Sequence, residues 1–467
     1  QEEPDRPEDL AKIPLLERSD IRRKIEPIIL EERKIEDTKL IYHKIETNGV
    51  SYFRLLFDIS EVPAELFAYV GILKAAIGLV DTQNYSYQEL FTQTDLLTGG
   101  IVPVTNIYPN ITNPSERKIT FEIKGKALDP KLDVLFAMMR EILMESKLGD
   151  EKRLKEILSM LKTRLQTSFL SAGHTTAVLR SLSYTSPIAR FRDITSGIGF
   201  YEVVKDLEEN FEERKELLIE NLKKIAGRIF RKENLMLSYT SAQEGLAVLE
   251  KAVPQFADSL HTGEKESHGQ CIIHCKKRNE GFRTSSKVQY VARTGNFIDG
   301  GAEYTGALQI LKVILSYDYL WQNVRVKGGA YGCMSGFNRI GEGYLVSYRD
   351  PNLEKTMEIY EGVVDYLKNF DIDDRDMNKF IIGTISNLDR PMNPAAKGSR
   401  SLNLYMNRIT EEMIRREREQ ILDAQQEDIR GLATVLEAVL AAGELCVIGS
   451  EEKIEEAKEM FGEIRTL

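Results

Sequence analysis

The chain of 467 residues has few cysteines and no long apolar run, and each shortage excludes a class of protein. Four cysteines are too few for a fold stapled by disulfides, so we expect free thiols in a reducing compartment. No apolar run approaches the roughly 18 residues of a membrane-spanning helix, and the start lacks the pattern of a secretory signal peptide. We therefore expect no membrane partner.

Basic charge is also in deficit, with 63 Lys and Arg residues against 73 Asp and Glu residues. The net charge of -10 makes nucleic acid an unsuitable partner, because phosphate binding needs a basic face. A hydrophobic content of 42% is typical of soluble globular proteins. At this length we expect two to four domains, each with its own core.

The sequence does contain a pattern of predicted strands and helices that occurs twice in the same order. In the first half, two β-like runs flank Asn48-Gly49, which predicts a hairpin, and an apolar helix follows at residues 64–80. The further elements that we expect are strands at 101–108, 118–125 and 234–240 with a helix at 132–143, then strands at 287–294, 344–348 and 444–450 with helices at 305–324 and 357–367.

Three short matches between the halves support a tandem duplication. In chain order, Gly99-Gly100 matches Gly328-Gly329, Asp129-Pro130-x-Leu132 matches Asp350-Pro351-x-Leu353, and Asn234 matches Glu444. The sequence therefore predicts an α+β protein of two tandem homologous domains. Each domain would have a mixed or antiparallel sheet with helices packed on one face.

The domain boundaries follow from composition. Residues 1–37 are rich in charge and are typical of a connector with some helical content. The first domain would span 38–262 and the second 263–467, divided within the polar stretch 261–270. The chain begins with Gln1 rather than Met, so we expect a processed product or a part separated from a longer chain.

Candidate metal ligands are few and poorly spaced. The run from His43 to Thr47 lacks the second histidine of the zinc motif His-x-x-Glu-His and leads into Asn-Gly, so we interpret it as an edge strand. A second cluster, His268, Cys271, His274 and Cys275, has suitable atoms for zinc. Its run CIIHC is typical of a strand with buried cysteines, so we predict no metal in this chain.

His174 is a lone histidine with no partner nearby in the sequence. The chain also contains no Gly-x-Ser-x-Gly elbow and no P-loop. These absences leave nucleophilic catalysis and nucleotide binding without support.

The segment VRVKGGAYGC, residues 324–333, is the strongest candidate for a functional site. Its structural interpretation is a helix end and a glycine turn, with Arg325 solvated and Tyr331 half-buried. Its functional interpretation is that the glycines allow a peptide to approach, Tyr331 donates to a developing oxyanion and Arg325 holds a carbonyl or carboxylate. From the residues alone both interpretations remain open.

The segment RVKGGAYG, with the following GEGYLVSYRDPN and a helix, resembles the fourth domain of presequence proteases, in the pitrilysin/insulinase family of zinc metallopeptidases. In the first half, EDLAKIPLLERSDI, ETNGVSYFRLLFDIS and the TGGI at 98–101 resemble the connector and third domain of the same family. The resemblance covers essentially the whole chain and implies the LuxS/insulinase-like metallopeptidase fold.

In that family two halves close around an unfolded peptide, and the N-terminal half carries the zinc. The resemblance implies that Tyr331 stabilises the tetrahedral intermediate and that Arg325 orients the peptide carbonyl. Gly328, Gly329 and Ala330 would lie along the substrate. The helix expected at 64–80, which corresponds in order to the zinc-motif helix, contains no histidine and no acid beyond Glu65.

The resemblance thus implies the non-metal half of a zinc-dependent endopeptidase that degrades short unstructured peptides. Its partner would be a zinc-bearing N-terminal half, in the same polypeptide or a separate chain, and this chain alone would be inactive. The alternatives are a catalytically inactive peptide-binding or scaffold subunit and a free-standing pair of peptide-binding domains. We expect a cytoplasmic location in a bacterium and an organelle matrix in a eukaryote.

Overall fold

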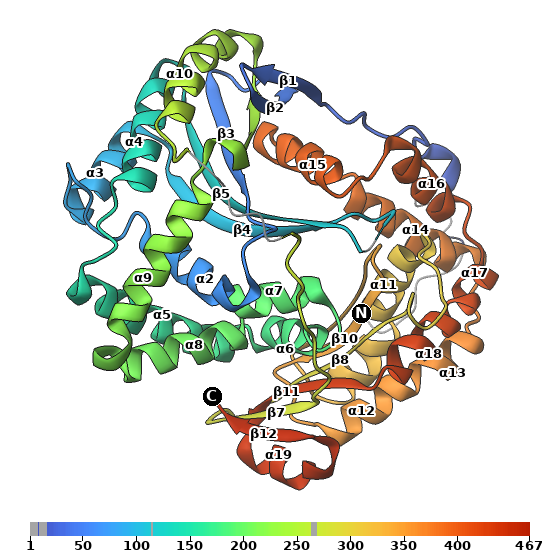
Figure 1. Cartoon of the computed structure of the whole chain (residues 1–467). Coiled ribbons are helices and arrows are strands. Elements are labelled where there is room, and N and C mark those ends of the chain that lie inside the picture. The colour runs from blue at the N-terminus through green and yellow to red at the C-terminus, as the bar shows by residue number, and fades with distance from the viewer. Residues whose placement is uncertain (1–7, 9–15, 114, 263–268) are drawn as a thin grey trace.

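Two six-stranded mixed sheets form the framework of the molecule (Figure 1). The computed structural model describes Glu8 and residues 16–113, 115–262 and 269–467. The first sheet has the strand order β1-β2-β6-β3-β5-β4 and the second the order β12-β7-β11-β8-β10-β9. Within the described residues, no helix combines the length and apolar character needed to cross a membrane.

The elements of the first half are β1 Glu31–Ile35, β2 Thr38–Lys44, β3 Val50–Asp58, α2 Phe67–Ala76, α3 Tyr87–Leu97, β4 Ile101–Pro109, β5 Arg117–Leu128, α4 Leu132–Met144, α5 Glu151–Ser171, α6 Gly173–Leu182, α7 Pro187–Ser196, α8 Ile198–Glu209, α9 Phe211–Ile229, β6 Leu235–Ser241 and α10 Leu246–Asp258. Those of the second half are β7 Glu280–Thr284, β8 Tyr290–Asn296, α11 Ala307–Tyr317, the π-helix η6 Trp321–Val326, β9 Gly332–Phe337, β10 Glu342–Tyr348, α12 Glu354–Glu361, α13 Val363–Lys368, α14 Asp374–Leu388, α15 Pro394–Met406, α16 Glu411–Leu422, α17 Gln426–Gly431, α18 Ala433–Ala441, β11 Glu444–Ser450, α19 Glu451–Glu456 and β12 Glu463–Thr466.

The two sheets confirm the predicted duplication. In each, a parallel pair (β2 with β6, β7 with β11) is followed by the same run of antiparallel neighbours, β3-β5-β4 or β8-β10-β9. The three sequence matches fall at equivalent places: the glycine pairs precede β4 and β9, the Asp-Pro pairs follow β5 and β10, and the third match opens β6 and β11. The sheets differ at one edge, where β1 is antiparallel to β2 and β12 is parallel to β7.

The hairpin predicted around Asn48-Gly49 is wrong. Both residues do form a turn with positive φ, at 53° and 78°. However, β6 lies between β2 and β3, so the two strands that the turn joins do not pair with each other. A turn signal is local and does not reveal that a strand from much later in the chain inserts between its arms.

Each sheet buries one face against helices of its own domain. In the first domain, α4 packs on β5 and on α10, in a core that includes Phe57 and Phe121. In the second domain, α18 packs on β8 and β10, α11 packs on β9, and α13 packs on α18, in a core that includes Leu311 and Val447. These side chains are fully buried, each worth about 1.5–3 kcal/mol of transfer free energy.

The opposite face of each sheet is covered by a helix from the other half, which the sequence did not predict. Helix α6 of the first half lies against β8, β10 and β11, and helix α15 of the second half lies against β2, β4 and β6 (Figure 1). At the second contact, Leu402 and Met406 of α15 pack on Ile41 and Met236. The two domains therefore exchange helices and form one packed body.

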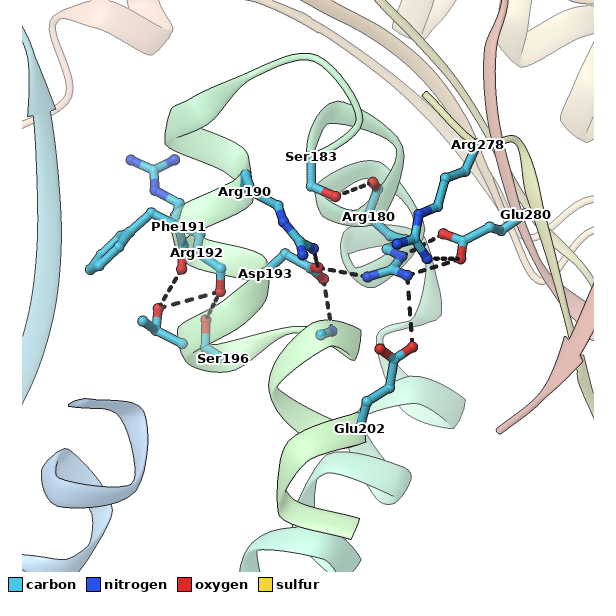
Figure 2. A network of polar contacts seen from close by, with 12 residues as sticks. Arg180, Ser183, Arg190, Phe191, Arg192, Asp193, Ser196, Glu202, Arg278 and Glu280 are labelled. Atoms are coloured by element: carbon cyan, nitrogen blue, oxygen red, sulfur yellow. Dashed lines mark hydrogen bonds and ion pairs between the residues drawn. The ribbon is translucent and has the colours of Figure 1, made fainter. Parts of the chain in front are cut away.

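A buried ionic cluster fastens α6 to the second sheet (Figure 2). Arg180 of α6 is 1% exposed and bonds both carboxylate oxygens of Glu280 in β7, at 2.5 and 2.9 Å. Its third contact is Asp193 of α7, at 2.7 Å. Burial acts to raise the pKa of Glu280, but the hydrogen bond and charge of Arg180 outweigh it and hold that pKa below its ordinary value.

The charged N-terminal segment crosses both domains. Arg18 donates to Asn378 and to the carbonyl of Ala424, and Arg23 forms an ion pair with Asp423, so this part lies on helices of the second half. Residues 31–35 then form β1, an exposed edge strand that the sequence did not indicate. The proposed domain limits at 37 and 262 remain predictions.

The segment CIIHC is not a strand, contrary to our expectation. Residues 271–275 have no regular secondary structure and pair with no strand. The N–H of Cys271 donates to the carbonyl of Ser60, and its carbonyl accepts from Arg117. Cys271 and Cys275 are half-buried rather than buried, and His274 is exposed. His268, the other member of the predicted cluster, and most of the stretch 261–270 lie outside the described residues.

Candidate functional site

The candidate site is a short loop between a helix and an edge strand of the second sheet. The polypeptide leaves α11, forms the π-helix Trp321–Val326, turns at Gly328 and Gly329, and enters β9. The N–H of Lys327 donates to the carbonyl of Gln322 five residues earlier, at 3.0 Å, which is the π-type bond. Such single π-turns are rare in proteins, and those that occur are frequently at functional sites.

Each position of the pair requires glycine for a different structural reason. A β-carbon at Gly328 would clash with the carbonyl oxygen of Val324, so the turn closes too tightly for a side chain. Gly329 has φ +82°, in the left-handed region that glycine adopts without strain. The carbonyl of Gly328 also accepts from the side chain of Asn352, at 2.6 Å. The loop is therefore held in one conformation.

Arg325 projects from the last turn of the π-helix. Its guanidinium carbon lies 4.0 Å from the ring centroid of Trp321, four residues earlier, in a cation–π contact. The side chain is exposed and has no hydrogen bond or ion pair within the described part of the chain. The ring fixes the direction of the guanidinium, while the N–H donors at the rim of the group stay free.

Tyr331 is 68% exposed, so the half-buried position of the structural interpretation is wrong. Its hydroxyl has no partner among the residues that the structure describes, whereas its backbone N–H donates to the carbonyl of Tyr348 at 3.0 Å. The phenol therefore stands free on a backbone anchored to β10. A single exposed aromatic ring is common on protein surfaces, so the exposure makes Tyr331 accessible to a ligand without itself indicating one.

Three consecutive backbone N–H groups of the loop, at residues 329–331, form hydrogen bonds. The N–H of Gly329 donates to Arg325 at 2.8 Å, and the N–H of Ala330 donates to Val324 at 3.1 Å. Ala330 itself is buried, at 4% exposed. A ligand at this loop would thus meet the side chains of Arg325 and Tyr331, since the N–H groups of residues 329–331 are already used.

Two contributors were missed in the sequence. Trp321 is the one tryptophan of the chain, and its spacing of four residues from Arg325 is the signal that could have indicated the cation–π contact. Asn352 follows the Asp-Pro match, and nothing in its local sequence indicates that it reaches Gly328.

The weaker candidates do not assemble a metal site. Among the described residues, no group of three or more His, Cys, Asp and Glu side chains could hold a metal ion. His43 is on an inner strand rather than an edge strand and is fully buried, so that interpretation is corrected. Its Nδ1 donates to the carbonyl of Ile29 at 2.8 Å, and its Nε2 accepts from Ser238 at 3.2 Å.

The remaining histidine of the sequence analysis, His174, packs edge-on against Tyr348 with the ring centroids 4.9 Å apart. It lies at the start of α6, where this helix meets the second sheet. The ring of His174 therefore packs where α6 contacts β10 of the second sheet.

Comparison with known proteins agrees with this architecture. The family model for the region associated with M16 peptidases of subfamily C matches residues 1–207, and the model described as "PreP C-terminal domain" matches residues 279–451. The second match contains the whole of the glycine loop. One model thus matches the first half of the chain and the other matches the second half.

Two curated relatives align over nearly the full chain. The protein HypA of Clostridium perfringens is 35% identical over 100% of this chain and 48% of its own length. Presequence protease 1 of Arabidopsis thaliana, named as chloroplastic/mitochondrial, is 29% identical over 98% of this chain and 42% of its own length. The chain therefore spans about half the length of the curated relatives it matches.

Solved structures show the same fold. A peptidase M16 inactive domain from Pseudomonas fluorescens matches with a TM-score of 0.61 and 11% identity, over 90% of this chain and 98% of that one. A conserved protein from Enterococcus faecalis matches with a TM-score of 0.65 and 13% identity, over 91% and 99%.

The fold and the two family models define a chain of the M16 peptidase class. More specifically, the chain corresponds to the C-terminal half of a presequence-protease-like M16 peptidase.

Proposed function

We propose that this chain is the non-metal half of a zinc-dependent endopeptidase that degrades short unstructured peptides. The observation that carries the proposal is the pair of free donors on the glycine loop. Arg325 and Tyr331 are exposed and without polar partners among the described residues, and both rise from a backbone that is fixed by its own hydrogen bonds.

Each donor suits one part of peptide hydrolysis. The guanidinium of Arg325 would donate to the carbonyl oxygen of the bound peptide and fix its orientation. The hydroxyl of Tyr331 would donate to that oxygen as it becomes negative in the tetrahedral intermediate. Because the loop is already ordered, little conformational entropy is lost when these donors engage the substrate.

The metal would come from a complementary N-terminal half. The residues described for this chain offer no set of ligands that fits zinc. Zinc bound by the other half would supply the activated water. The role of this chain is then to bind and orient the peptide and to stabilise negative charge on its oxygen.

A reconstitution experiment tests the proposal. The chain is combined with the N-terminal half of a presequence protease that carries zinc, and cleavage of an unstructured peptide is followed by mass spectrometry. We expect cleavage by the assembly and by neither half alone, with a large loss when Arg325→Ala replaces the wild-type chain. An assembly that forms but cleaves no peptide would instead identify this chain as a peptide-binding or scaffold subunit.

A further inference from the structure

A cavity of about 290 Å³ opens at the other glycine pair, between the first sheet and the N-terminal end of α15. Its walls come from β3, β5, β6, the segment before β4, and α15. Three charged side chains line it, those of Arg54, Lys124 and Lys126, and all three are basic. Since the chain as a whole is acidic, this local excess of positive charge is unusual.

Only one of these charges is neutralised by the residues that the structure describes. Arg54 forms an ion pair with Glu122 at 3.2 Å and donates to Ser399 of α15 at 3.1 Å. In the same part of the chain, Lys124 and Lys126 have neither a hydrogen bond nor an ion pair. Burial, and then the nearby charge of Arg54, lower the pKa of Lys124, and the charge of Glu122 offsets this only in part.

The glycine pair positions one of the lysines. A β-carbon at Gly99 would lie 2.5 Å from Cγ and 2.6 Å from Cε of Lys126, so the stem of this lysine lies directly across the glycine. Gly100 has φ +108°, which holds the turn in a conformation that other residues rarely adopt. The stem of Lys126 therefore lies against the turn at the rim of the pocket, and the residue remains exposed.

The walls between the charges are mainly apolar, with the hydroxyl-bearing residues Ser238, Thr240 and Ser399 on one side. Tyr52, Val102 and Ala395 line the pocket, and Val102 is 54% exposed. A bare inorganic anion would leave these walls in contact with water. A ligand with an apolar body and one anionic end would cover the walls and place its charge at the lysines.

We propose that this pocket binds a carboxylate group of a peptide, supplied by a free C-terminus or by an acidic side chain. The proposal rests on the proposed function only in taking the ligand to be a peptide. The pocket would provide a second point of attachment, in the domain that lacks Arg325 and Tyr331, and would favour peptides with a carboxylate over peptides without one.

Calorimetric titration of this chain tests the proposal without a zinc-bearing half. The probes are three forms of one unstructured peptide that has no other acidic residue: a free C-terminal acid, a C-terminal amide, and the amide with one internal Glu. We expect the acid, the Glu form or both to bind about tenfold or more tightly than the plain amide, because a charge-assisted hydrogen bond is gained. Whichever form gains affinity identifies the source of the carboxylate.

The double variant Lys124→Gln with Lys126→Gln should abolish this preference. Lys118→Gln is the matched control, since Lys118 lies on the same strand but does not line the pocket and pairs with Asp58 instead. Thermal unfolding verifies that each variant is folded. Equal affinity for all three peptides, or a preference that survives the double variant, overturns the proposal.

The outcome is separable from that of the cleavage experiment. A carboxylate preference in a chain whose assembly cleaves nothing would retain the pocket and reject the catalytic role of the glycine loop. Cleavage by the assembly, with no carboxylate preference in the chain, would do the reverse.

Discussion

The two glycine pairs occupy equivalent positions in the two domains and present different surfaces. Gly99-Gly100 precedes β4, supports the stem of Lys126 and adjoins a basic pocket under α15. Gly328-Gly329 precedes β9 and carries Arg325 and Tyr331 outward. Duplication therefore preserved the backbone that a tight turn requires, while the side chains around it diverged toward two kinds of contact.

Helices α6 and α15, which each pack on the sheet of the other domain, also make different kinds of contact. At the contact of α6, Arg180, Glu280 and Asp193 form an ionic cluster whose side chains are at most 2% exposed. At the contact of α15, the side chain of Arg54 is 12% exposed and borders a cavity. The first contact is a closely packed, buried contact between the domains, whereas the second leaves room for a ligand.

Breaking the two arginine contacts should show this difference most strongly. Arg180→Met removes the buried cation that bridges Glu280 and Asp193 and leaves them only the partly exposed Arg278, Arg465 and Arg190. We expect a loss of about 3–4 kcal/mol in the free energy of unfolding, toward the lower end for a broken buried ion pair. Arg54→Met should cost less, about 1–3 kcal/mol, because Glu122 keeps hydrogen bonds from Tyr108 and Thr120. Urea unfolding of both variants checks the order, and an equal or reversed order contradicts the comparison.

Substitutions in the two glycine pairs should lower the stability of the protein by similar amounts but impair different functions. Gly100→Ala and Gly329→Ala each force a side chain onto positive φ, at 108° and 82°, and we expect each to cost about 1–2 kcal/mol. In the reconstituted assembly, Gly329→Ala should lower kcat/KM by more than its effect on folding explains, because it displaces Arg325 and Tyr331. Gly100→Ala should instead weaken the preference for peptide carboxylates. The opposite assignment would show that the two loops do not have separate roles.

The smallest effect concerns pH. Burial lowers the pKa of His43, a hydrogen bond to Ile29 opposes this, and the charge of Arg54 adds to it. The unfolded chain therefore binds more protons than the folded one once the pH falls below about 6.5, and stability decreases there as the pH decreases. His43→Gln should flatten this slope in urea unfolding between about pH 7 and pH 5. His261→Gln, at an exposed position, is the matched control for the substitution itself.

Local signals account for the parts of the fold that the sequence predicted. The glycine pairs, the Asp-Pro pairs and the strand openings are short patterns whose geometry depends on neighbouring residues, and they align the two domains correctly. The hairpin at Asn48-Gly49 was wrong because pairing depends on β6, which comes from the far end of the first domain. The exchange of α6 and α15 was missed because an amphipathic helix does not indicate which sheet it covers.

The same distinction applies to the sites. Arg325 and Tyr331 were singled out because they lie within one short motif, and their catalytic roles remain a prediction. The basic pocket was missed because β3, β5 and α15 bring its residues together from distant parts of the chain. No local pattern could have joined Lys124 with Ser399.

The role of Tyr331 is tested most directly by the kinetics of Tyr331→Phe in the reconstituted assembly. The matched control is Tyr317→Phe, which removes a hydroxyl from a tyrosine of similar exposure, 69% against 68%. We predict that Tyr331→Phe lowers kcat about 100-fold or more with little change in KM, because the hydroxyl acts on the transition state, while the control is unaffected. A kcat equal to that of the wild-type assembly would contradict the account.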